Sequence, residues 1–115
     1  MRAQQAGFFM RAFGDGTRLR VVAALSHRPL RFGELGRVLR CPKERLARHL
    51  QYLHDRRVIE SQRTGQTVVY RLADAQHALH RAALAAVLTS LGDIDEVEQD
   101  RSRMRGHTRG GGSKG

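Results

Sequence analysis

The amino-acid sequence predicts a mainly helical domain that carries one β-hairpin. Segment 42–54 has three leucines at the spacing i, i+4, i+7, which anchors one edge of a helix to a core, and arginines on its other side. Two β-prone segments, 57–62 and 67–72, follow directly and are joined by a short polar turn. A basic helix that leads into a basic-tipped hairpin is typical of a winged helix-turn-helix fold. The three leucines are Leu46, Leu50 and Leu53.

Three further helices are expected before this segment. Segment 4–13 predicts a short helix with phenylalanines available for burial. The second helix starts after a Gly-Asp-Gly-Thr break, with Asp15 or Thr17 as its N-cap. The third, 32–39, has apolar residues at helical spacing, although two glycines lower its intrinsic helix propensity. Pro42 suits the first position of the basic helix that follows.

The chain after the hairpin divides into two parts. Segment 75–91 predicts a long Ala- and Leu-rich helix with a stripe of side chains suited to contact with another helix. Beyond residue 92, acidic residues are followed by arginines and then by a glycine-rich end of linker composition. We therefore expect one domain, 1–92, and a charged, Gly-rich flexible tail, 93–115, whose start has room for a short helix. The stripe consists of Leu79, Ala82, Ala83, Ala86 and Val87.

The chain is strongly basic, with a net charge of +10 from 21 Lys and Arg against 11 Asp and Glu. An excess this large indicates nucleic acid or an anionic membrane surface as the partner. No stretch approaches the roughly 18 apolar residues of a transmembrane helix, and the N-terminus lacks the apolar run of a signal peptide. Because the single cysteine, Cys41, has no partner for an internal disulfide, we expect a reducing, cytoplasmic location.

The sequence contains no pattern typical of a catalytic site. It has no Gly-rich phosphate loop, no nucleophile beside a base and no paired carboxylates in a plausible pocket. We therefore expect a protein that is not an enzyme.

The outward side of the basic helix supplies candidate DNA contacts. Arg45 and Arg48 lie one turn apart, away from the leucines, where an Arg fork can pair with guanine in the major groove. The alternative is a solvated cationic face. His49 lies at the edge of the buried side, so that both a base contact and structural packing are open. Glu44 can accept a hydrogen bond from cytosine or complement the helix dipole.

The hairpin tip adds further candidates, although an exposed tip is polar by default. Arg56, near the end of the basic helix, opposes the helix dipole there and can also reach a phosphate. The complete set of candidate DNA-binding residues is Lys43, Glu44, Arg45, Arg48, His49, Gln51, Arg63, Thr64 and Gln66.

Three segments in register resemble the ArsR–SmtB family of small dimeric bacterial repressors. Segment 13–25, Phe-Gly-Asp-Gly-Thr-Arg-Leu-Arg-Val-Val-Ala-Ala-Leu, looks like the family's "GDPTRLRIL" opening. Segment 46–53, Leu-Ala-Arg-His-Leu-Gln-Tyr-Leu, is similar to its "VSRHLKVL" recognition helix, and segment 63–72 resembles its "REGRWVYYRL" wing. The resemblance implies a homodimer, paired through its first and last helices, that represses a promoter until a signal releases it. The implied dimer interface consists of Phe8, Phe9, Leu79, Ala82, Ala83, Ala86 and Val87.

The sequence departs from the family at its metal sites, so we expect no cofactor. The family's thiol-rich "ELCVCDL" site falls at 34–39, which carries no cysteine. Asp74, His77 and His80 recur every three residues; they could bind zinc or a similar metal, or form a polar helix start capped by Asp74. Cys41, where the family has a buried leucine, is either a core residue or a site of modification.

Taken together, these features predict a sequence-specific DNA-binding regulator. The expected form is a homodimeric repressor that recognises an inverted-repeat operator in double-stranded DNA. The alternative is a protein-interaction module that keeps the winged-helix scaffold and binds a protein partner. The basic helix and the basic hairpin favour the first interpretation.

Overall fold

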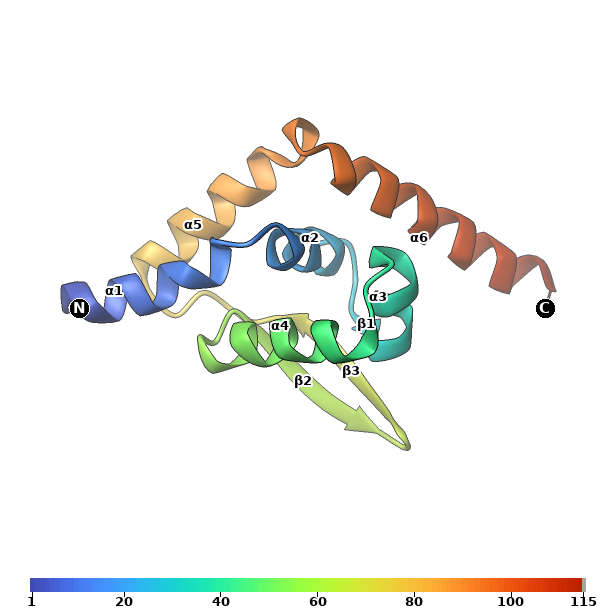
Figure 1. The fold of residues 1–115 in the computed structure, drawn as a ribbon, viewed down its shortest axis with the longest axis horizontal. Helices are drawn as coiled ribbons and strands as arrows, with labels where there is room; N and C mark the ends of the chain where they lie inside the picture. The colour runs from blue at the N-terminus through green and yellow to red at the C-terminus, as the bar shows by residue number, and fades with distance from the viewer. Residues whose placement is uncertain (115) are drawn as a thin grey trace.

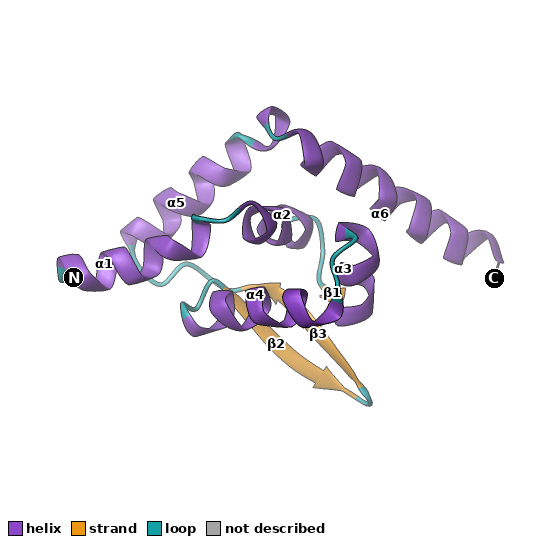
Figure 2. Ribbon diagram, viewed as in Figure 1, coloured by secondary structure: helices purple, strands orange, loops and turns teal. Residues whose placement is uncertain are grey.

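Helices predominate in the fold, and three short strands form one small sheet (Figure 1, Figure 2). The computed structural model describes the backbone of residues 1–114 and the side chains of residues 1–105. Within this part of the chain, no helix has the length and apolar character needed to span a membrane. In chain order the elements are α1 (Ala3–Met10), the 3-10 helix η1 (Arg11–Phe13), α2 (Gly16–Leu25), β1 (Leu30–Arg31), α3 (Phe32–Leu39), α4 (Lys43–Asp55), β2 (Ile59–Thr64), β3 (Thr67–Leu72), α5 (Ala78–Thr89), the 3-10 helix η2 (Leu91–Asp93) and α6 (Asp95–Lys114).

The core lies where α2, α3 and α4 meet. All three leucines predicted to face inward from α4 are buried, and they pack with apolar side chains of α2 and α3. Helix α3 has the predicted bounds, because burial of Leu35, Val38 and Leu39 outweighs the low helix propensity of its glycines. This arrangement fixes the inward side of α4 and, with it, the side that faces solvent.

The first strand of the hairpin is shifted from its predicted position, and the hairpin is joined by a strand that was not predicted. Strand β3 has the predicted bounds, whereas β2 starts and ends two residues later than the predicted 57–62, so that Thr64 pairs with Thr67. Gly65 at the tip has φ +66, a left-handed conformation that glycine adopts without steric cost. Strand β1 pairs with β3 to give the antiparallel order β1-β3-β2. Because Leu30 of β1 is fully buried, this pairing ties the base of the hairpin to the core.

The N-cap residues of three helices can be compared with those predicted. Asp15, not Thr17, caps α2, because its Oδ2 accepts a hydrogen bond from the amide of Arg18 at 3.1 Å. Pro42 is the N-cap of α4 and precedes the first helical residue by one position. Helix α5 starts at Ala78, later than the predicted residue 75, and its cap is His77 instead of Asp74.

Helices α1 and α5 lie side by side at one end of the protomer (Figure 1). Phe9 of α1 is buried, and its ring contacts the rings of Phe13, His77 and His80. Phe9 and Ala83 therefore belong to the protomer's own core. Among the other residues of the implied dimer interface, Phe8, Ala82 and Ala86 are exposed, and Leu79 and Val87 are half-buried.

The described residues after 92, which the sequence assigned to a tail with room for a short helix, form η2 and α6. Helix α6 packs against α2 and α3 (Figure 1). Val97, Asp100 and Met104 are all buried, at the spacing i, i+3, i+7 that gives a helix one inward edge. Helix α6 is thus part of the same domain, and α5 is not the last helix. The side chains of the glycine-rich end, 110–115, lie outside the described residues.

Candidate nucleic-acid interface

The side of α4 opposite its leucines is exposed and mostly polar. Because an α-helix turns once every 3.6 residues, burial of one leucine edge leaves the intervening residues facing solvent. Of the candidate contacts on α4, only His49 is partly buried. The exposed residues of α4 are Lys43, Glu44, Arg45, Ala47, Arg48, Gln51, His54 and Asp55.

The two outward arginines of α4 are available for an external acceptor. No hydrogen bond or ion pair among residues 1–105 engages the side chain of Arg45 or Arg48. Gln51, by contrast, donates to Oδ1 of Asp55 at 2.7 Å. A guanidinium without a partner offers a planar fork of N–H donors, which matches a phosphate or the major-groove edge of guanine.

His49 is held between α4 and α2. Its Nδ1 lies 3.3 Å from Nη1 of Arg18 and 3.7 Å from Oδ2 of Asp15. Burial lowers the pKa of His49; the Asp15 carboxylate opposes this shift, and the charges of Arg18, Arg48 and Arg45 add to it. These contacts favour structural packing over a base contact for this side chain.

Two arginines stack on one tyrosine of α4. The guanidinium carbons of Arg56 and Arg18 lie 3.4 and 4.0 Å from the ring centroid of Tyr52. Arg56 also lies over the ring of Phe8, and its Nε donates to the carbonyl of Phe8 at 2.7 Å. Arg18 donates to the carbonyl of Ala12 at 3.0 Å. This stacked cluster ties α4 to α1 and η1.

Most contacts of the stacked cluster could not be predicted from the sequence. Arg18 and Tyr52 stand 34 positions apart and at no motif spacing, so that only the fold shows their contact. For Arg56, the structure supports the first of its two expected roles. Its Nη1 donates to the carbonyl of Tyr52 at 3.2 Å, in the last turn of α4, where a cation complements the helix dipole.

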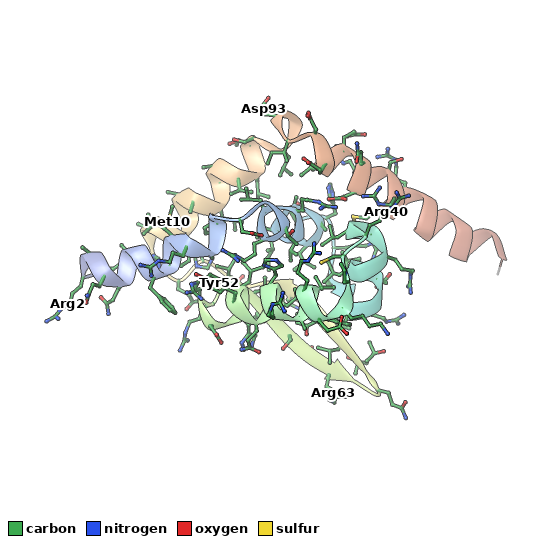
Figure 3. All side chains as sticks on the ribbon, in the orientation of Figure 1. Arg2, Met10, Arg40, Tyr52, Arg63 and Asp93 are labelled. Carbon is green, nitrogen blue, oxygen red and sulfur yellow. The ribbon has the colours of Figure 1, made fainter. Side chains whose placement is uncertain are left out.

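The hairpin tip presents its three candidate residues, Arg63, Thr64 and Gln66, to solvent. Arg63 lies far out on the hairpin (Figure 3). Between the hairpin and the start of α3 is an open cleft of about 380 Å³, lined by Arg31, Arg63 and two aromatic rings. Arg31, on the unpredicted strand β1, was not among the candidates. Two cations beside a groove of this kind can bind a sugar–phosphate backbone.

Cys41 lies in the core just before α4. It is 9 % exposed and packs in the central apolar cluster, and its amide donates to the carbonyl of Gly36 at 3.1 Å. A buried thiol of this kind behaves as a small hydrophobic side chain. The geometry therefore favours the core role over a site of modification.

The two histidines at the start of α5 accept hydrogen bonds from backbone amides. Nδ1 of His77 accepts from the amide of His80, and Nδ1 of His80 accepts from the amide of Gln76, both at 3.1 Å. An imidazole that accepts at Nδ1 carries its proton on Nε2, so that neither nitrogen keeps a lone pair for a metal. Among residues 1–105 no three His, Cys, Asp or Glu side chains are placed to share a metal ion. The arrangement favours a helix start over a metal site.

The burial of His80 predicts a dependence of stability on pH. Burial, and secondarily the neighbouring His77, lowers the pKa of His80 below its usual 6.5. Its Nε2 has no hydrogen-bond partner among the described residues, which makes a charge there unfavourable. Below about pH 6.5 the unfolded chain therefore binds more protons than the folded chain, and the free energy of unfolding falls as the pH falls.

Urea unfolding between pH 7.5 and pH 5 measures this effect. The His80→Gln variant should lose less stability over that range than the parent chain, whereas a His54→Gln variant, altered at an exposed histidine, should follow the parent. Parallel losses in the parent and the His80→Gln variant would show that His80 does not carry the effect.

The order of elements and the exposed basic helix define the chain as a winged helix-turn-helix domain. No family model matches the chain. It is 32% identical over 73 residues to "Transcriptional repressor SmtB homolog" from a Synechocystis strain, covering 64% of this chain and 55% of that protein. It is 38% identical over 61 residues to "HTH-type transcriptional regulator Rv2034" from Mycobacterium tuberculosis, covering 53% and 57%. These similarities confirm the resemblance to the ArsR–SmtB family.

The chain spans about half the length of the curated relatives it matches. Solved structures at lower identity share its fold. HlyU from Vibrio cholerae superposes with a TM-score of 0.65 at 24% identity, covering 76% of this chain and 94% of that one. The homodimeric winged helix-turn-helix DNA-binding domain of Mb0332 from Mycobacterium bovis gives 0.65 at 22% identity, covering 76% and 80%. The winged helix-turn-helix fold predicted from the sequence is confirmed.

Proposed function

We propose that this chain is a transcriptional repressor that binds double-stranded DNA as a homodimer. One observation carries the proposal: Arg45 and Arg48 stand exposed on the outward face of α4, with no hydrogen-bond or ion-pair partner among residues 1–105, beside a hairpin that carries Arg63 at its tip. We refer to α4 as the recognition helix. The names of the sequence relatives support a repressor of DNA transcription over a module that binds only protein.

The expected mode of binding follows from the geometry of the fold. Each recognition helix lies in a major groove, with half-sites of an inverted repeat about one helical turn apart. Lys43 at the helix start and the arginines of the hairpin cleft neutralise phosphates on either side. The proposal places the protein in the cytoplasm with the DNA that it regulates, and assigns it no enzymatic activity.

The surface formed by α1 and α5 supports a homodimer. Phe8 and Met10 of α1 are 44% and 41% exposed, so both large apolar side chains are available for burial against a second copy. The outward face of α5 carries alanines, including Ala82 and Ala86, where a solvated helix usually carries charges. Small residues allow two helices to approach closely, so a second copy fits this surface.

A fluorescence titration tests the proposed function. The purified protein is titrated against a duplex from upstream of its own gene and against a shuffled duplex, at about 50 and about 200 mM salt. Neutralisation of about 6–10 phosphates should lower the affinity by about 10³–10⁵-fold between the two salt concentrations. Preference for the upstream duplex should survive the higher salt. Equal binding of both duplexes that disappears with salt would contradict a specific repressor.

Replacing Arg48 by Ala should weaken the specific complex by about 1–3 kcal/mol and relax the preference at one base pair. The reason is the loss of a bidentate contact to guanine, which an alanine cannot replace. The measurement is a titration against duplexes varied at each position of the site. Arg105→Ala removes the same charge from an exposed position of α6 and serves as the control. A uniform loss across all duplexes would assign Arg48 to a phosphate instead.

A further inference from the structure

The last four carbonyl groups of α3 all accept hydrogen bonds, but some of the donors come from outside the helix-turn-helix. A helix leaves its last four carbonyls without partners inside the helix. Those of Gly36 and Arg37 accept from the amides of Cys41 and Arg40 in the following turn. The remaining two belong to Val38 and Leu39, the residues next to the turn.

Two arginines from other helices bind these last two carbonyls. Arg20 of α2 donates through Nη2 to the carbonyl of Leu39 at 2.8 Å. Arg103 of α6 donates through Nε to the carbonyl of Val38 at 2.5 Å. Cations at this end of a helix also complement its dipole. The end of α3 is therefore capped by side chains that come from α2 and α6.

Asp100 of α6 joins the two arginines. Its Oδ2 accepts from Nε of Arg20 at 2.8 Å, and its Oδ1 accepts from Nη2 of Arg20 at 2.8 Å and from Nη2 of Arg103 at 2.6 Å. The residue is 3% exposed, and a buried carboxylate is tolerated only when it is paired in this way. Asp100 fixes both guanidiniums in the orientation that reaches α3. We call this set of three side chains the carbonyl clamp.

The clamp holds the backbone immediately before a strained residue. Arg40, the residue after Leu39, has φ 51 and ψ 48, a left-handed conformation unfavourable for a residue with a Cβ atom. Such a conformation persists only where its surroundings over-determine it. Cys41 and Pro42 follow, and then α4 begins, so the backbone at Arg40 lies in the short turn that leads into α4.

We propose that Asp100 is a positioning residue for the recognition helix: through Arg20 and Arg103 it fixes the end of α3 and so the angle at which α4 meets DNA. This inference rests on the proposed function. It assigns α6 a part in DNA binding without contact to DNA. The family-like motifs lie within residues 13–72, so α6 is an addition to them.

The main test variant is Asp100→Asn. It removes the negative charge and places the new amide N–H₂, a donor, against an arginine N–H, so at least one hydrogen bond is lost. Glu98→Gln is the matched control, since it removes the same charge from an exposed position of α6. Arg103→Gln is a milder second variant, because Arg103 is partly exposed and Arg20 stays paired with Asp100; its loss frees the Val38 carbonyl and removes one hydrogen bond to Asp100. All are studied at a temperature where circular dichroism shows each protein fully folded.

Two readouts separate positioning from a loss of fold. The first is the affinity for the upstream duplex relative to the shuffled duplex, which Asp100→Asn should lower by about 2- to 30-fold. The second is amide hydrogen exchange in the absence of DNA. The amide of Cys41, bonded to the carbonyl of Gly36, should lose protection in Asp100→Asn and Arg103→Gln, while amides in α5 keep theirs. Glu98→Gln should change neither readout.

Unchanged affinity in fully folded Asp100→Asn overturns the inference, whether or not Cys41 loses protection. A lower affinity with full protection at Cys41 also overturns it, since the effect would not pass through the turn. If the parent chain shows no preference for the upstream duplex, the proposed function fails. The exchange measurement then still decides whether Asp100 positions the turn.

Discussion

Glutamates in place of both Ala82 and Ala86 are expected to split the proposed dimer and to lower the affinity for an inverted-repeat duplex by about 10²–10⁴-fold. In a two-fold symmetric interface each patch meets its own copy, so the substitutions place four carboxylates against one another. A monomer binds one half-site and loses the gain that comes from linking two binding events. Both alanines are exposed within the protomer, so the fold itself should tolerate the change.

Sedimentation velocity and the duplex titration measure the two expected effects. Gln99→Glu combined with Ser102→Glu adds the same charge at exposed positions of α6 and should leave the chain dimeric. This control variant measures the general repulsion between added carboxylates and DNA. A double variant carrying Ala82→Glu and Ala86→Glu that remained dimeric would remove α5 from the interface.

Replacing Leu50 by Ala should lower the free energy of unfolding by about 2–5 kcal/mol. The side chain is 2% exposed and packs in the central cluster, so its removal leaves a cavity that the surrounding helices fill only in part. Urea unfolding followed by circular dichroism measures the change. Arg45→Ala, on the opposite side of the same helix, should stay within about 0.5 kcal/mol of the parent chain. Equal effects at the two positions would contradict the assignment of the inward face.

The part of the fold that follows from local sequence could be predicted. The leucine spacing of α4 identified its buried side, and with it the exposed side that carries Arg45 and Arg48. The bounds of α3 were predicted, because its apolar residues recur at helical spacing. The two-residue strand β1 was missed, since so short a segment shows no alternation and is defined by its pairing with β3.

The packing of α6 could not be predicted, because its composition resembles a solvated segment. Only three of its described side chains are buried, and one of them is an acid. Asp100 is stable in the interior because Arg20 meets it from a point 80 positions earlier in the chain. A contact between such distant positions leaves no periodic signal in one sequence. The contact between Arg18 and Tyr52 could not be predicted for the same reason.

The carbonyl clamp also bears on why this chain uses arginine so heavily. Of its 21 basic residues, those of the clamp work as internal cross-links, joining helices by a bridge with a carboxylate at its centre. Lysine would preserve the formal charge of +10 but not the bridge, since an ammonium group lacks the planar fork that binds a carboxylate and a carbonyl together. In a chain with a single cysteine, guanidinium groups thus cross-link helices, as disulfides do in secreted proteins. Some of the arginines that make the chain basic therefore stabilise its fold and do not serve to bind DNA.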